Sequence, residues 1–338
     1  MDQPTETPAE QLAGTPTDQA AEARTEQPTE AKAPPAADLS AILIHQSAHL
    51  RWYHLEEPDS PLLDQLGHEF SFHELEIEDC RHRDHTAKLE EYDNHIFVIA
   101  NSLHFVPETC GVWFGEVAFF VGQDFLVTVH LGHTRSVEAV LPKVKAVTKM
   151  QRPDRVLYAL LDTMIDRCLP VLYRMGDRIE EVEDKIHQSP TQAALGEIFA
   201  LKRALIEFRR TVGGMREMVN ALTRQRPPYY RADMTAYWRD LYDHVIRALT
   251  MIETYRDLLA SVLEIYLTAT ANRTNEVMKV LTVYATILMP MVVITSYFGM
   301  NFSHLPLLES PNGVMVVHVL MGVLSVGLLV FFRWRRWL

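Results

Sequence analysis

Two long runs without a charged side chain lie near the C-terminal end of the chain. Val280 to Met300 forms the first run and Gly313 to Phe332 forms the second. A helix of about 20 residues, with a rise of about 1.5 Å per residue, crosses a hydrocarbon layer about 30 Å thick. Buried core helices seldom stay uncharged on every face for so long. The pattern therefore predicts two membrane-spanning helices, with two buried core helices as the alternative.

A helical pattern leads into the first run without a break. From Met234 to Met300 the chain has no glycine before Gly299, and Pro290 is its single proline. This predicts one helix on the order of 100 Å long. Its first half is amphipathic and charged, so it must bury a stripe against other helices, including copies of itself. We expect a stalk helix that continues into the first span over residues 231–300.

The region before the stalk divides into two kinds of pattern. Runs rich in β-branched and aromatic residues at His95–Asn101, Val112–Val121 and Phe125–His130 predict strands, and the pattern between Pro61 and Glu91 is helical. We expect an α/β domain over 41–150. Residues 154–188 and 191–223 then predict two long antiparallel helices within 151–230. The expected fold class is α+β.

The net charge of −12 is unevenly distributed. Residues 1–40 contain eight acidic and two basic side chains, a net charge of −6, and few large apolar ones. Such a composition predicts a disordered tail. The three cysteines form no CxxC pair, which argues against a zinc ribbon or a disulfide framework. The chain has no basic stripe with interleaved aromatic residues, so nucleic acid is not expected as a partner.

The flanks of the two runs predict their orientation. Arg333, Arg335 and Arg336 follow the second run, whereas the connection 301–312 contains no Lys or Arg. The positive-inside rule then places the C-terminus and the N-terminal part in the cytoplasm and the connection 301–312 outside. Residues 313–338 are expected to form the second span and a basic C-terminal end. We expect a multi-pass protein of the inner (cytoplasmic) membrane, in contact with lipid.

One face of the first predicted span collects small and polar residues. They recur at alternating steps of three and four residues: Asn275, Met278, Thr282 or Leu281, Ala285, Met289, Val292, Ser296 and Gly299. Such a face indicates either a lumen or a helix–helix contact, so plain dimer packing is the alternative.

The first span ends in Tyr297-Phe298-Gly299-Met300-Asn301-Phe302, which resembles the signature of the CorA magnesium transport family. Five further segments resemble that family in the same order along the chain: Glu74–Asp79, Tyr237–His244, Asn272–Thr282, Met289-Pro290 and Arg335–Leu338. The resemblance implies a homopentamer with a cytoplasmic funnel. It also implies a pore lined by Asn275, Met278, Leu281, Ala285, Met289, Val292 and Ser296, and a selectivity filter of Gly299, Met300 and Asn301.

The chemistry of these residues suits a hydrated divalent ion. Mg²⁺ dehydrates reluctantly, so a filter for it should bind its water shell. A ring of Asn301 amide oxygens can accept hydrogen bonds from that water, and rings of apolar side chains can close a pore by dewetting. We expect potential-driven uptake of Mg²⁺, with Co²⁺ and Ni²⁺ as accompanying ions. No ATPase motif or HExxH is present, so an enzyme is not expected.

Two further features concern other metal sites. The resemblance places a regulatory carboxylate at Asp240, but at the expected position of its partner the chain has His82, with Asp84 nearby. A solvated helix face is the alternative for Asp240. His304 in the connection would favour Zn²⁺, Co²⁺ or Ni²⁺ if it were a ligand. A Zn²⁺ transporter with proton coupling, and a non-conducting scaffold or metal sensor, are the rival functions.

Overall fold

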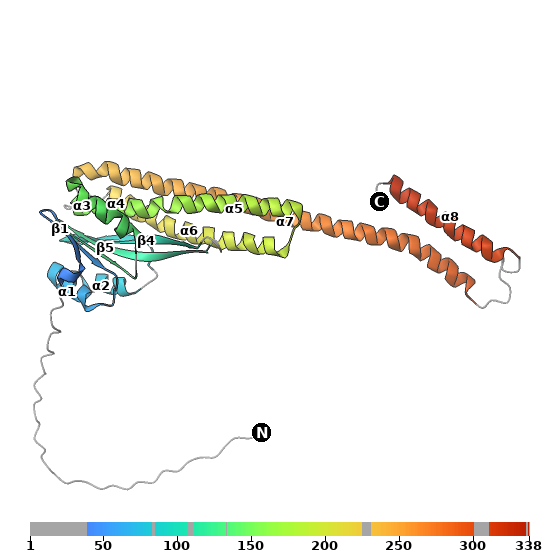
Figure 1. Ribbon diagram of the computed structural model, residues 1–338, viewed down its shortest axis with the longest axis horizontal. Coiled ribbons are helices and arrows are strands. Elements are labelled where there is room, and N and C mark those ends of the chain that lie inside the picture. The colour runs from blue at the N-terminus through green and yellow to red at the C-terminus, as the bar shows by residue number, and fades with distance from the viewer. Residues whose placement is uncertain are drawn as a thin grey trace, which may run out of the picture. The chain divides into compact units, whose positions relative to one another are not determined.

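The computed structural model describes residues 39–82, 85–106, 111–132, 134–224, 231–300, 311–335 and 337 (Figure 1). The expectation of a disordered tail over 1–40 falls almost wholly outside the described residues, which begin with the short 3₁₀ helix η1 (Leu39–Ile42).

A six-stranded sheet forms the centre of the N-terminal region. The strands run in the order β1-β2-β6-β5-β4-β3, and β2 and β6 are parallel while the other neighbours are antiparallel. The three predicted strands are confirmed as β4, β5 and β6, of which β4 and β5 are longer than expected. The strands are β1 (Leu43–Ser47), β2 (Leu50–Leu55), β3 (Lys88–Glu91), β4 (His95–Val106), β5 (Gly111–Gly122) and β6 (Phe125–His130).

The helical prediction for Pro61–Glu91 is wrong at its C-terminal end. Lys88–Glu91 is strand β3, which pairs antiparallel with β4 at the edge of the sheet. Its sequence, KLEE, has helical propensity, but pairing with a long buried neighbour overrides a weak local preference. Strands β1 and β2 were not predicted, because their short mixed sequences show no clear alternation.

Two short helices cover one face of the sheet. Helix α1 (Pro61–Phe70) starts at Ser60, whose hydroxyl accepts a hydrogen bond from the Leu62 amide. Helix α2 (Glu74–Arg81) starts with a capping box between His73 and Glu76. Together they bury an aromatic core, in which Phe72 stacks on Phe120 with ring centroids 3.9 Å apart.

The longer helices pack on the opposite face. They are α3 (Arg135–Ala146), α4 (Pro153–Asp166), α5 (Cys168–Gln188) and α6 (Gln192–Arg224), with the 3₁₀ helices η2 (Thr148–Met150) and η3 (Ala232–Met234). The single helix expected over 154–188 is divided at Arg167. Pro170 explains the division, because it has no N–H to donate to the carbonyl of Asp166 one turn earlier.

The predicted stalk helix is present, and both segments predicted to span the membrane are helical. Helix α7 (Thr235–Phe298) is 64 residues long, and α8 (Gly313–Trp334) follows the connection. The first part of α7 runs beside α5 and α6 (Figure 1) and buries Trp238, Leu241 and Val245. One continuous core therefore extends from the sheet through α3–α6 to Val262 of α7.

Candidate functional site: a helix face and a carboxylate cluster

The C-terminal half of α7 packs on α8 through one face. Val283 is buried on that face, and Ile287, Met291, Ile294 and Phe298 are half-buried. Their spacing of three to four residues keeps them on one side of the helix. Both helices are apolar enough to cross a membrane.

The small and polar face lies on the other side of α7. All seven residues from Asn275 to Ser296 that the sequence assigned to a pore are exposed in the single chain: Asn275, Met278, Leu281, Ala285, Met289, Val292 and Ser296. At about 100° per residue, the mean direction of these side chains is about 180° from that of the buried and half-buried residues Val283 to Phe298 named above. Met289 has 69% of its surface exposed and Val292 has 60%. We call this face the α7 seam.

Threonine hydroxyls in this segment are satisfied within the helix. Thr282 Oγ1 donates to the Met278 carbonyl at 2.8 Å, and Thr286 Oγ1 donates to the Thr282 carbonyl at 2.7 Å. Such internal bonds let polar side chains sit in an apolar helix at low cost. Pro290 lies inside the helix and interrupts its hydrogen-bond ladder.

Helix α7 ends at the first residue of the predicted filter. The Gly299 amide donates to the Thr295 carbonyl at 2.9 Å, and the Met300 amide donates to the Tyr297 carbonyl at 3.4 Å. Gly299 has φ of −84°, so its backbone conformation does not require glycine. A Cβ there would lie 3.1 Å from the Thr295 oxygen, which is a tight contact. Asn301 and His304 lie outside the described residues.

A group of ionisable side chains gathers where α4 crosses α7. His244 Nδ1 lies 3.5 Å from Asp162 Oδ1 and 3.3 Å from Asp166 Oδ1, and its Nε2 lies 4.0 Å from Asp240 Oδ1. Tyr158 donates its hydroxyl proton to Asp240 Oδ2 at 3.0 Å. We call Asp162, Asp166, Asp240 and His244 the carboxylate cluster.

The electrostatics of this cluster favour a cation. Burial raises the pKa of Asp162, the negative charges of Asp166 and Asp240 raise it further, and His244 opposes them. One ligand atom each from Asp162, Asp166 and His244 lie within 4.8 Å of one another. Carboxylate oxygens with one imidazole are suitable ligands for divalent cations.

The sequence predicted a regulatory carboxylate at Asp240, which stays a prediction, but it did not predict these neighbours. Asp162 and Asp166 are four residues apart on α4, as are Asp240 and His244 on α7, so each pair shares a helix face. That spacing was a readable signal, but only the crossing of the helices brings the pairs together. His82 follows α2, and its Nδ1 lies 3.9 Å from Glu78 Oε1 in that helix. Asp84 lies outside the described residues.

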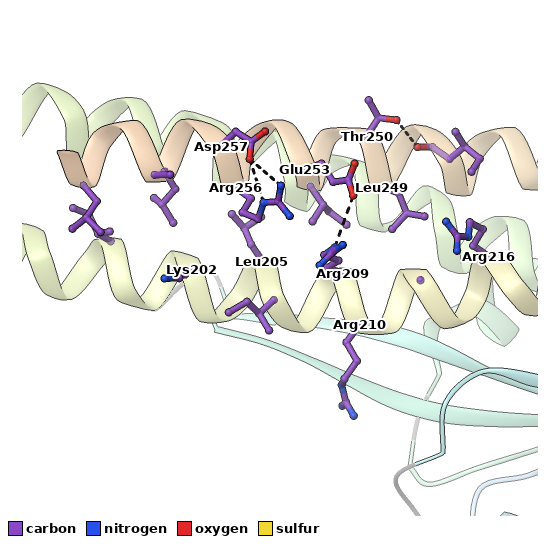
Figure 2. A pocket seen from close by; sticks show the side chains of 18 residues that line it. Lys202, Leu205, Arg209, Arg210, Arg216, Leu249, Thr250, Glu253, Arg256 and Asp257 are labelled. Carbon is purple, nitrogen blue, oxygen red and sulfur yellow. Dashed lines mark hydrogen bonds and ion pairs between the residues drawn. The ribbon is translucent and has the colours of Figure 1, made fainter. Parts of the chain in front are cut away.

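Helices α6 and α7 also enclose a groove of about 860 Å³ (Figure 2). Apolar side chains such as Leu205 and Leu249 line it together with charged ones. In this groove Arg209 lies 3.9 Å from Glu253, and Arg256 contacts Asp257 at 3.0 Å. The groove is a long surface on the stalk, with an apolar lining and both signs of charge.

Several proteins are similar to this chain over most of its length. The cobalt/magnesium transport protein CorA of Thermotoga maritima is 30% identical over 280 residues, which cover 82% of this chain and 80% of that protein. The putative metal ion transporter YfjQ of Bacillus subtilis is 30% identical over 288 residues, covering 85% and 88% respectively. The solved structure of the CorA magnesium transporter from Methanocaldococcus jannaschii has a TM-score of 0.72 at 23% identity, and the match covers 84% of this chain and 89% of that one.

An α/β domain, a long stalk helix and two C-terminal helical segments apolar enough to cross a membrane are typical of a membrane protein. The sequence model of the CorA-like Mg²⁺ transporter protein family matches residues 47–336. The chain belongs to this family, and it is a divalent cation transporter and not an enzyme.

Proposed function

We propose that five copies of this chain form a channel for hydrated Mg²⁺, with the α7 seams around a common axis. The observation that carries this proposal is the exposure of the seam on the face of α7 opposite α8. A face with Asn275, Ala285 and Ser296 among its members has no reason to contact lipid. In this arrangement α8 lies on the outside of the ring.

The filter of this channel is Gly299, Met300 and Asn301 at the outer end of α7. Five Asn301 amides bind the water shell of the ion and not the bare ion, which keeps binding weak enough for release. The membrane potential drives uptake, since a divalent cation that crosses 100 mV gains about 4.6 kcal/mol. Co²⁺ and Ni²⁺ pass with Mg²⁺. The protein lies in the inner membrane with both termini in the cytoplasm.

The carboxylate cluster gives this channel a cation sensor in its cytoplasmic part. When Mg²⁺ binds, it neutralises the repulsion between Asp162, Asp166 and Asp240 and ties α4 to the stalk helix α7. Because α7 continues into the seam, a change in that contact can alter the pore.

The groove between α6 and α7 is the surface through which neighbouring copies of the chain assemble. A second copy of the chain is its occupant, because Ile206 and Leu258 are exposed beside or within it and both signs of charge are available for pairing. Contacts along the stalk would keep the seams facing one another.

Ion uptake into liposomes tests the filter. We expect Asn301→Ala to reduce Mg²⁺ uptake by the purified protein to the leak rate of empty liposomes, because the amide ring is lost. The matched control is Asn312→Ala, since Asn312 lies at the start of α8 and makes no side-chain cap to that helix. Equal uptake by wild type and Asn301→Ala would refute the proposed filter and favour a scaffold.

A further inference from the structure

The C-terminal ends of strands β2 and β6 hold two histidines side by side. His54 Nε2 and His130 Nε2 lie 3.3 Å apart, whereas the ring centroids are 4.8 Å apart and the ring planes are tilted by 41°. The rings therefore approach through their Nε2 edges and do not stack. Both side chains are largely protected from solvent, with 11% of the His54 side chain and 4% of His130 exposed.

A buried hydrogen-bond network orients His54. Thr128 Oγ1 donates its proton to the Tyr53 carbonyl at 3.2 Å and accepts one from Trp52 Nε1 at 3.2 Å. His54 Nδ1 lies 2.8 Å from the same hydroxyl, so this contact fixes the orientation of the imidazole ring. In the tautomer whose Nδ1 donates its proton to Thr128, the lone pair of His54 is on Nε2, the atom that faces His130.

A carboxylate is within reach of the same nitrogen. Glu56 Oε1 lies 3.7 Å from His54 Nε2, and 45% of the Glu56 side chain is exposed, which leaves it room to rotate. The Gly132 amide donates to the Glu56 carbonyl at 3.1 Å, with Gly132 at φ of +76°. This backbone bond holds the turn after β6 against the end of β2, the two chain segments that carry His130 and Glu56.

We propose that His54, His130 and Glu56 bind a transition-metal ion such as Zn²⁺ or Co²⁺. Two nitrogens at bonding distance from a tetrahedral zinc ion are separated by roughly 3.3–3.4 Å, which agrees with the spacing of the two Nε2 atoms. Thr128 contacts the other ring nitrogen of His54, Nδ1, and so orients the imidazole for metal binding through Nε2. Mg²⁺ prefers six oxygens and does not suit this site. The site is separate from the pore and the carboxylate cluster, and the inference does not rest on the proposed channel.

Optical spectroscopy with Co²⁺ tests this site in the full-length protein in detergent. After chelation of bound metals, the protein is saturated with Mg²⁺ to occupy oxygen-rich sites and is then titrated with Co²⁺. We expect one Co²⁺ per chain with the intense visible bands of tetrahedral coordination, and loss of the bands when Zn²⁺ is added. The variants His54→Gln and His130→Gln should lose the bands, while His244→Gln in the carboxylate cluster should keep them.

Two milder variants keep the test decisive if a buried histidine variant does not fold. Glu56→Gln changes an exposed carboxylate, and Thr128→Val leaves both imidazoles in place. Each should weaken Co²⁺ affinity by about 10- to 100-fold, as expected for a lost ligand or orienting group. Absence of the bands in the wild type would overturn the proposal, and the histidines would then share only a proton. Unchanged affinity in both Glu56→Gln and Thr128→Val would overturn it equally.

Discussion

Gly176 lies in the middle of α5, where the ring of Tyr255 from α7 crosses it. A Cβ at this position would lie 2.7 Å from the Tyr255 hydroxyl oxygen and 2.8 Å from Cζ. We expect Gly176→Ala to lower the free energy of unfolding by about 1–3 kcal/mol, because the ring must move. The effect should be visible as a lower melting temperature in detergent.

Gly196 in α6 is the matched control for that substitution. No atom outside its own helix lies within 4 Å of a Cβ built there. Alanine is preferred over glycine in a helix by about 1 kcal/mol, so Gly196→Ala should raise stability slightly. If both variants melted at the same temperature, close packing at Gly176 would not be the reason for its glycine.

The ionised form of Asp162 in the carboxylate cluster lowers the stability of the folded protein. Because its pKa is raised in the folded protein by burial and then by Asp166, its ionised form destabilises the fold. Protonation relieves this, so stability without cations should fall as pH rises from about 4 through the raised pKa. We expect Asp162→Asn to melt at a higher temperature than wild type at neutral pH in chelator.

The same variant should respond less to Mg²⁺. Wild type should gain melting temperature as Mg²⁺ is added, because the ion binds the folded state and offsets the repulsion. Asp162→Asn should lose most of that gain, while Asp184→Asn at an exposed position of α5 should keep it. A full Mg²⁺ response in Asp162→Asn would exclude Asp162 as a ligand.

The two faces of α7 differ in what they contact, and cysteine labelling can measure the difference. We expect Ser296→Cys on the seam to react with a water-soluble thiol reagent and block uptake. Ile294→Cys, which faces α8, should react slowly. Reversed reactivities would show that the seam faces lipid or another helix.

The native cysteines allow this measurement. Cys80 and Cys168 are buried, and burial raises the pKa of the Cys168 thiol to about 12, so little thiolate is present to react. Cys110 lies outside the described residues and would be replaced by serine in all variants.

Among the helices and strands, the sequence predicted those whose apolar residues recur with a strong periodicity. The α7 helix and the strands β4–β6 were foreseeable because their apolar patterns are long and regular. Strand β3 was not, because its residues become a strand only through their pairing with β4. The break at Arg167 could have been predicted, because Pro170 is visible in the sequence.

The whole molecule functions as a ring of chains if the proposed channel is correct. Chains of wild type and Asn301→Ala, mixed before assembly, should then form particles with a shared filter. If one altered chain disables a pentamer, uptake at an equal mixture should fall to a few per cent of wild type. A linear fall would mean that each chain conducts alone, and mixing with Asn312→Ala chains controls for assembly.

The sequence alone determined the membrane segments, the stalk and the family motif of this protein, because these depend on the local order of residues. The uncharged runs and the Gly299-Met300-Asn301 motif need no distant partner to be recognised. Only the tertiary structure brought His54 to His130, and Asp162 to His244, across 76 and 82 residues of chain. Such contacts arise from strand order and helix crossing, which local periodicity does not encode. The same is true of the face that α7 leaves open when it packs on α8.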